Sequence, residues 1–134
     1  MKRLNVVLER TDTGYSAYSN EIPGCAATGK TYDETKKNIV DAIDSHLELL
    51  KEFNEEIPEV LQSDYELSFK LDSITFFEWL DGIMTKAGIS RISGINQSLI
   101  SQYAMGIKNP SQKQLLKIEK AIHKFGADLQ AFSF

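Results

Sequence analysis

The amino-acid sequence predicts an α+β protein with two domains, residues 1–72 and 73–134. In the first domain, apolar and polar residues alternate with the period of β-strands around one long helical stretch. In the second, apolar residues recur every three or four positions, which is the period of α-helices. The first domain holds 8 Lys/Arg and 15 Asp/Glu, a net charge of −7, and the second holds 7 and 4, a net charge of +3. This difference indicates either two modules with different partners or one solvated acidic helix face.

The first domain is predicted to have the order β-β-β-α-β. Residues 4–8 alternate and predict the first strand, and a turn at 11–14 leads to the second strand at 15–19. The small residues at 25–29 predict a third strand that a neighbouring backbone can approach closely. Apolar and polar residues alternate again over 65–71, which predicts the fourth strand. We therefore expect three antiparallel strands, a covering helix and a returning fourth strand.

A long helix is predicted between the third and fourth strands. Thr31 and Glu34 form a Thr-x-x-Glu capping box at its start. Its apolar residues fall at spacings of three and four and predict one buried stripe, made of Ile39, Ile43, Leu47, Leu50 and Phe53. The acidic residues of the helix fall mostly on its solvated face.

The second domain is predicted to be helical throughout. Its first helix carries four large apolar residues, Phe76, Phe77, Trp79 and Leu80. We expect them to form core, with a partner-binding face as the alternative. Thr85 is predicted to cap a helix over 86–93, and Ser111 with Gln114 forms a capping box for a later helix. That later helix is expected to end at Gly126.

The stripe of the later helix is expected to be buried and comprises Leu115, Leu116, Ile118, Ala121, Ile122 and Phe125. A half-buried turn or short helix is expected to follow over 127–132.

Residues 85–110 contain the most specific pattern in the chain. Gly94 allows a helix to end with positive φ, Ile95 is expected to enter the core, and Asn96 is expected to cap the next helix. Polar side chains that can reach base edges follow on the outer face of that helix, at Gln97, Ser98, Ser101 and Gln102. The pattern predicts two short helices joined by a tight turn, as in DNA-binding proteins.

Composition excludes several classes of protein. Hydrophobic residues make up 42% and charged residues 25%, as in soluble globular proteins. No apolar run approaches the roughly 20 residues of a membrane span, and no export signal opens the chain. The single cysteine, Cys25, excludes an internal disulfide. We therefore expect a cytoplasmic protein that contacts no membrane.

No catalytic residues, metal ligands or cofactor are predicted, and we expect a protein that is not an enzyme. Metal-dependent nucleases need several carboxylates that converge on a cation, and the acids here are spread along a helix face. His46 has no acid or cysteine partner in the sequence pattern and is expected to pack at an edge. Cys25 has no neighbouring group that would activate it and is expected to act as a small hydrophobe.

Residues 4–53 resemble the HicB-type antitoxin domain. The resemblance rests on the order and spacing of Gly14-Tyr15, Ile22-Pro23-Gly24-Cys25, Thr28-Gly29, Thr31 and the helix stripe that begins at Ile39. It implies a partial ribonuclease-H-like fold without nuclease chemistry. It also implies a partner, a small basic HicA-like toxin that cleaves mRNA and whose catalytic histidine the antitoxin covers.

Residues 85–129 are similar to the phage-repressor (XRE) helix-turn-helix family. The similarity rests on Ile-Asn-Gln-Ser-Leu-Ile-Ser, Gly-Ile-Lys-Asn-Pro-Ser and Leu-Leu-Lys-Ile, in that order. It implies seven DNA-binding residues: Lys86, Gln97, Ser98, Ser101, Gln102, Lys108 and Asn109. The family usually has glutamine at the position of Lys86 and often arginine at that of Gln102. These departures leave the base sequence unpredicted, apart from an adenine contact by Gln97.

The roles implied for these residues differ. Lys86 sits where the family has a phosphate-contacting or glutamine-supporting group at the start of the first helix of the motif, and Lys108 with Asn109 matches the family's loop that contacts the DNA backbone. The base-reading positions are Gln97, Ser98, Ser101 and Gln102, although plain surface solubility is an equal alternative for Ser98 and Ser101.

Together the resemblances imply the antitoxin of a type II HicA/HicB-like system, which occludes the toxin and represses its own operon by binding operator double-stranded DNA. So small a motif requires a homodimer or higher homo-oligomer. Candidate contacts are Phe125, Leu129, Phe132 and Phe134, although core is preferred for Phe132 and Phe134 is undecided. The alternative is a stand-alone repressor with a ligand-sensing or dimerising N-terminal domain, which predicts an apolar pocket there. RNA binding by that domain is disfavoured by its net charge of −7.

Overall fold

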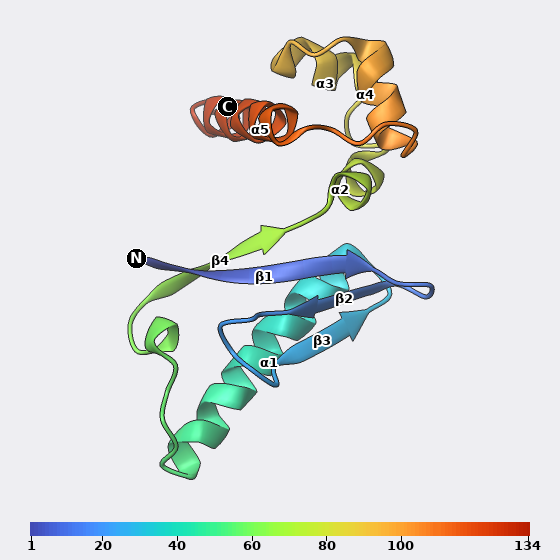
Figure 1. Ribbon diagram of the computed structural model, residues 1–134. Helices are drawn as coiled ribbons and strands as arrows, with labels where there is room; N and C mark the ends of the chain where they lie inside the picture. The colour runs from blue at the N-terminus through green and yellow to red at the C-terminus, as the bar shows by residue number, and fades with distance from the viewer. The chain divides into compact units, whose positions relative to one another are not determined.

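Four strands form one mixed sheet in the computed structural model, which describes residues 1–134 (Figure 1). They are β1 (Lys2–Arg10), β2 (Tyr15–Tyr18), β3 (Ala26–Gly29) and β4 (Tyr65–Lys70), and their order in the sheet is β3-β2-β1-β4. The pairs β1–β2 and β2–β3 are antiparallel, and β4 lies parallel to β1. The expected order β-β-β-α-β and the antiparallel pairing of the first three strands are confirmed.

Five α-helices complete this α+β fold: α1 (Tyr32–Glu52), α2 (Ser73–Leu80), α3 (Lys86–Ser93), α4 (Gln97–Ala104) and α5 (Gln112–Gln130). A short 3-10 helix, η1 (Glu59–Leu61), precedes β4. The chain divides into two compact units, Met1–Asp72 and Ser73–Phe134, called unit 1 and unit 2 below. None of the helices combines the length and the apolar character needed to cross a membrane.

The core of unit 1 lies between the sheet and α1, which covers one face of it (Figure 1). Leu4, Val6 and Leu8 occupy alternate positions of β1 and are buried together with Ile39 and Ile43 of α1. Because successive side chains of a strand point to opposite faces, this alternation directs one face of β1 into the core. The helix begins at the predicted cap: the Thr31 hydroxyl accepts a hydrogen bond from the amide of Glu34 at 3.1 Å.

Two glycines allow the backbone of unit 1 to pack closely. A Cβ atom on Gly14 would overlap the carbonyl oxygen of Gly29, across the β2–β3 pair. A Cβ atom on Gly29 would lie 2.7 Å from the amide nitrogen of Thr35 in the first turn of α1. The close approach expected of the third strand is therefore confirmed, and it occurs on two sides.

The predicted stripe of α1 is correct in its middle and wrong at its end. Ile39 and Ile43 are buried and Leu47 and Leu50 are half-buried, whereas Phe53 is 67% exposed. The reason is length: the four residues of β2 or β3 span about 13 Å, whereas 21 helical residues span about 31 Å. The last turns of α1 consequently extend beyond the sheet, with only the connection to β4 beside them (Figure 1).

Unit 2 has its own core, to which all four of its helices contribute. Phe77 and Leu80 of α2 are buried, and Phe76 and Trp79 pack against them half-buried. The core assignment of these aromatic residues is confirmed. The other buried members are Ile89, Ile95, Ile100, Tyr103 and Ile118.

Three expectations for α5 are wrong. Gly126 does not end the helix, which continues to Gln130, because an interior glycine costs only about 1 kcal/mol and good helix formers surround it. The stripe is not fully buried: Ile118 alone is buried, and Leu116 and Phe125 are exposed. Phe132 is 72% exposed and is not core. The tight packing of α5 is thus confined to its first half.

Candidate nucleic-acid interface

The helix α3 begins and ends at residues with suitable local chemistry. The Thr85 hydroxyl accepts a hydrogen bond from the amide of Gly88 at 3.0 Å and caps the start of the helix. Gly94 ends it in the left-handed conformation, with φ 72°, and its amide donates to the carbonyl of Ser90 at 2.8 Å. Glycine suits this position because it lacks the Cβ that opposes positive φ.

The turn between α3 and α4 is held by short hydrogen bonds and one buried side chain. The Ser90 hydroxyl donates to the carbonyl of Ile95, and the Ile95 amide donates to the Ser93 hydroxyl at 3.2 Å. The Ile95 side chain is buried in the core of unit 2. Asn96 then caps α4, since its side-chain oxygen accepts from the amide of Ser98 at 2.8 Å. The roles expected for Gly94, Ile95 and Asn96 are all confirmed.

The inner face of α4 fixes which side chains point outward. Ile100 and Tyr103 are buried, which leaves Gln97 and Ser98 exposed in the first turn. Ser101 and Gln102 are half-buried rather than exposed, so they face solvent less fully than expected. The exposed polar surface of α4 is therefore concentrated at its N-terminal end, where free backbone amides also favour anionic groups.

Two of the predicted site residues line a common depression. Lys86, at the start of α3, and Gln97, at the start of α4, both border a shallow hollow of about 390 Å³. Thr85 and Ala87 border it as well, although the sequence reasoning treated Thr85 only as a cap. Because Thr85 caps α3 close to the exposed start of α4, its place at this depression could have been expected.

The remaining two predicted site residues lie in the loop that follows α4. Lys108 and Asn109 are exposed between α4 and α5. The Gln102 carbonyl accepts from the amides of Ile107 at 2.9 Å and Lys108 at 3.3 Å, which positions the start of this loop against the end of α4. Lys108 and Asn109 do not border the depression that Lys86 and Gln97 share.

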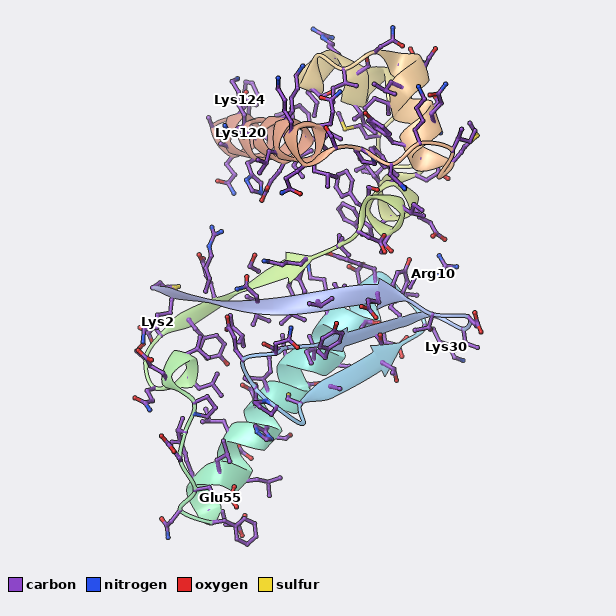
Figure 2. All side chains as sticks on the ribbon, in the orientation of Figure 1. Lys2, Arg10, Lys30, Glu55, Lys120 and Lys124 are labelled. Atoms are coloured by element: carbon purple, nitrogen blue, oxygen red, sulfur yellow. The ribbon has the colours of Figure 1, made fainter.

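A row of lysines gives α5 a positive face. Lys113, Lys117, Lys120 and Lys124 are all exposed and are spaced by four, three and four residues. Figure 2 shows Lys120 and Lys124 on the same side of the helix. Lys124 pairs with Asp128 at 3.0 Å, so its charge is partly offset. These four lysines account for more than half of the seven Lys/Arg residues of unit 2.

Outside this region, Cys25, His46 and the acidic residues are the side chains whose chemistry could matter. Burial raises the pKa of the Cys25 thiol, which disfavours the reactive thiolate. His46 is half-buried on α1. No three side chains among His, Cys, Asp and Glu lie close enough together to hold a metal ion.

Comparison with known proteins relates part of the chain to proteins of one family. The chain is 37% identical over 57 residues to a UPF0150 protein of Thermoplasma acidophilum, a match that covers 42% of this chain and 83% of that protein. It is 39% identical over 44 residues to a UPF0150 protein of Helicobacter pylori, which covers 33% of this chain and 61% of that protein. The chain belongs to the UPF0150 family.

A third relative comes from a bacteriophage. The chain is 34% identical over 53 residues to an uncharacterized 14.9 kDa protein in the rep-hol intergenic region of Haemophilus phage HP1. This match covers 40% of each protein. The chain thus spans less than two thirds of the length of the phage protein and, at 61%, of the H. pylori protein. No protein-family model matches the chain.

Proposed function

We propose that this protein is the antitoxin of a type II toxin–antitoxin pair of the HicA/HicB kind, and that it acts without catalysis. In this proposal unit 1 is a partial ribonuclease-H-like domain that binds a small basic HicA-like ribonuclease and covers its catalytic site. Unit 2 is a helix-turn-helix domain that binds operator double-stranded DNA, so that the complex represses its own operon in the cytoplasm.

The observation that carries the DNA-binding half is the arrangement of α3, the turn at 94–96 and α4. The αL glycine, the buried Ile95 and the Asn96 cap hold Gln97 and Ser98 exposed at the start of a helix. A helix placed in this way suits the major groove, where its first residues reach base edges. Lys86, Lys108 and Asn109 are the proposed contacts to the DNA backbone, and Gln97, Ser98, Ser101 and Gln102 are the proposed base readers.

Two features support the toxin-binding half. Membership of the UPF0150 family and the order β-β-β-α-β agree with the HicB resemblance of residues 4–53. The net charge of −7 in unit 1 also suits a basic partner, because opposite charge speeds association. Occlusion of a catalytic site requires only binding, so no reactive group is needed in unit 1.

The stand-alone repressor is the less favoured function. A ligand-sensing domain needs an apolar pocket with a few polar groups. One depression in unit 1, about 540 Å³, is bordered by four charged residues, Lys2, Arg3, Glu21 and Glu59, together with Pro58 and Val60. Its lining therefore gives no support to an apolar ligand.

The proposal includes a dimer that forms through the second half of α5. Phe125 and Leu129 continue the stripe of Ile118 and are exposed, as are Phe132 and Phe134 beyond the helix. Sedimentation velocity provides the test. We expect a dimer for the natural protein and a monomer for the Leu129→Ser variant; a variant that remains dimeric moves the interface elsewhere.

Toxin neutralisation provides the main test. The small basic protein that this proposal expects in a neighbouring reading frame is induced alone or with this protein, and growth and mRNA integrity are followed. We expect arrested growth and cleaved mRNA with the partner alone, and full rescue when both are present. Persistent arrest with both proteins would contradict the antitoxin function.

Binding of promoter DNA is tested by a salt titration. Log affinity should fall linearly with log salt, and Lys108→Ala should reduce the slope by about one unit, because one phosphate contact is lost. Lys51→Ala, in unit 1, is the control and should leave the slope unchanged. An unaltered slope for Lys108→Ala removes that residue from the DNA contacts.

A further inference from the structure

The negative charge of unit 1 is confined to one stretch of the chain. Residues 41–64 contain eight Asp/Glu and one Lys, whereas the rest of residues 1–72 contains seven of each sign. The whole excess of −7 therefore lies in the second half of α1 and its connection to β4. All eight acids are exposed, and only Glu59 has an ion-pair partner, Lys2 at 3.1 Å.

The two ends of α1 differ in how far other parts of unit 1 cover them. At its start, Lys36 lies over the rings of Tyr32, at 5.0 Å, and Phe69, at 4.9 Å, so its apolar neighbours are covered. At its far end the helix extends beyond the sheet. Figure 2 shows Lys30 and Glu55 at these opposite ends.

An apolar pair lies exposed among the acids at the far end. Leu49 is 53% exposed and Phe53 is 67% exposed, and the two are four residues apart, the spacing that places side chains on one helix face. Glu48, Glu52 and Glu55 flank them in sequence. A large aromatic side chain that remains in water is a typical anchor of a protein–protein interface.

The backbone holds this apolar pair in a defined position. The Asn54 amide donates to the carbonyl of Lys51 at 3.3 Å, and the Glu55 amide donates to that of Leu50 at 2.9 Å. Asn54 adopts φ 51°, so these bonds make the closed helix end known as a Schellman motif, with asparagine in the position usually taken by glycine. A side chain on a closed helix end loses less conformational freedom on binding than one on a frayed end.

We propose that the far end of α1, with Leu49 and Phe53 at its centre and Glu48, Glu52, Glu55 and Glu56 around them, is the surface that binds the basic protein partner. This inference rests on the proposed function and locates its protein-binding surface. The partner presents an apolar pocket for Phe53 and Lys or Arg side chains around it. The charge of this surface repels nucleic acids and anionic membranes, which leaves a basic protein as the occupant.

The anchor is tested by calorimetric titration of the full chain with the HicA-like protein that the proposed function expects as its partner, made inactive by replacing its catalytic histidine with alanine. Leu49→Ser/Phe53→Ser should raise the dissociation constant at least about 30-fold, as expected for loss of a central aromatic anchor. Val40→Ser is the matched control, because Val40 is also exposed on α1 but outside the acidic stretch, and its effect should stay below about threefold.

The acidic surround is tested by stopped-flow association rates. Glu52→Gln/Glu55→Gln/Glu56→Gln should lower the rate constant about tenfold and weaken its salt dependence, since steering by charge is lost. The control Glu9→Gln/Asp12→Asn/Glu21→Gln neutralises three exposed acids elsewhere in unit 1 and should change the rate little.

The outcomes separate the two proposals. If the natural chain binds the partner and the Leu49→Ser/Phe53→Ser variant binds as tightly, the far end of α1 is not the docking surface, although the antitoxin function stands. If the natural chain does not bind the partner at all, both the function and this surface are overturned.

Discussion

The two long helices begin in the same way and are used differently. Thr31 caps α1 and Ser111 caps α5, each by accepting a hydrogen bond from an amide three residues ahead. Both helices then carry an apolar stripe of similar spacing. The stripe of α1 crosses a sheet that buries Ile39 and Ile43, whereas that of α5 meets short helices that bury only Ile118.

The unburied parts of the two stripes also lie in opposite electrostatic surroundings. Leu49 and Phe53 lie among carboxylates at the end of α1, whereas the stripe of α5 runs beside a row of lysines. Two helices with one periodicity can therefore present surfaces suited to different partners. The length of the element beneath each helix determines how much of its stripe remains available.

The first and largest difference between a variant and its neighbouring control should come from the covered part of α1. We expect Ile39→Ala to lower the free energy of unfolding by about 2–5 kcal/mol, because Ile39 is fully buried between helix and sheet. Val40→Ala, the next residue on the exposed side, should change it by less than about 0.5 kcal/mol. Urea unfolding followed by far-UV circular dichroism measures both. Equal losses would mean that α1 is not packed as described.

The next effect concerns reading of DNA by unit 2. Gln97→Ala should weaken operator binding by about 1–3 kcal/mol and leave non-specific binding unchanged, because a base contact is lost. Gln112→Ala is a close control, since Gln112 is also an exposed glutamine at the first position of a capped helix. Fluorescence anisotropy with operator and scrambled DNA compares them. If both variants lose the same affinity, α4 is not the reading helix.

Two glycine-to-alanine substitutions in unit 2 should change its stability in opposite directions. Gly94→Ala should destabilise the unit by about 1–2 kcal/mol, because alanine resists the left-handed conformation at φ 72°. Gly126→Ala should stabilise it by up to about 1 kcal/mol, since Gly126 is helical and an added Cβ meets no atom within 4 Å. The single tryptophan, Trp79, packs against the core of unit 2, so its fluorescence can follow unfolding. Two shifts of the same sign would contradict this account.

The smallest effect should come from the end of the chain. Phe132→Ala should change the unfolding free energy by less than about 0.5 kcal/mol at low protein concentration, because Phe132 is exposed. Phe77→Ala, at a buried phenylalanine of the same unit, should cost about 3–5 kcal/mol. Thermal unfolding of the two variants makes the comparison, and a loss of several kcal/mol for Phe132→Ala would restore its assignment to the core.

Much of the candidate interface could be predicted because it depends on neighbouring residues. Gly94 at positive φ, the apolar Ile95 and the capping Asn96 form a local pattern that the sequence alone reveals. The partial burial of Ser101 and Gln102 could not be predicted from the sequence, because it depends on how α4 packs against neighbouring helices. The depression shared by Lys86 and Gln97 likewise joins residues from two helices.

The sequence by itself determined the elements and their ends: the caps at Thr31, Thr85 and Ser111 and the turn at Gly94. These features follow from hydrogen bonds and φ preferences within a few residues, which need no distant partner. Only the tertiary structure decided that β4 pairs in parallel with β1, that Phe53 projects beyond the sheet and that Phe132 stays in water. Burial requires a covering element from elsewhere in the chain, and periodicity alone does not reveal where that element stops.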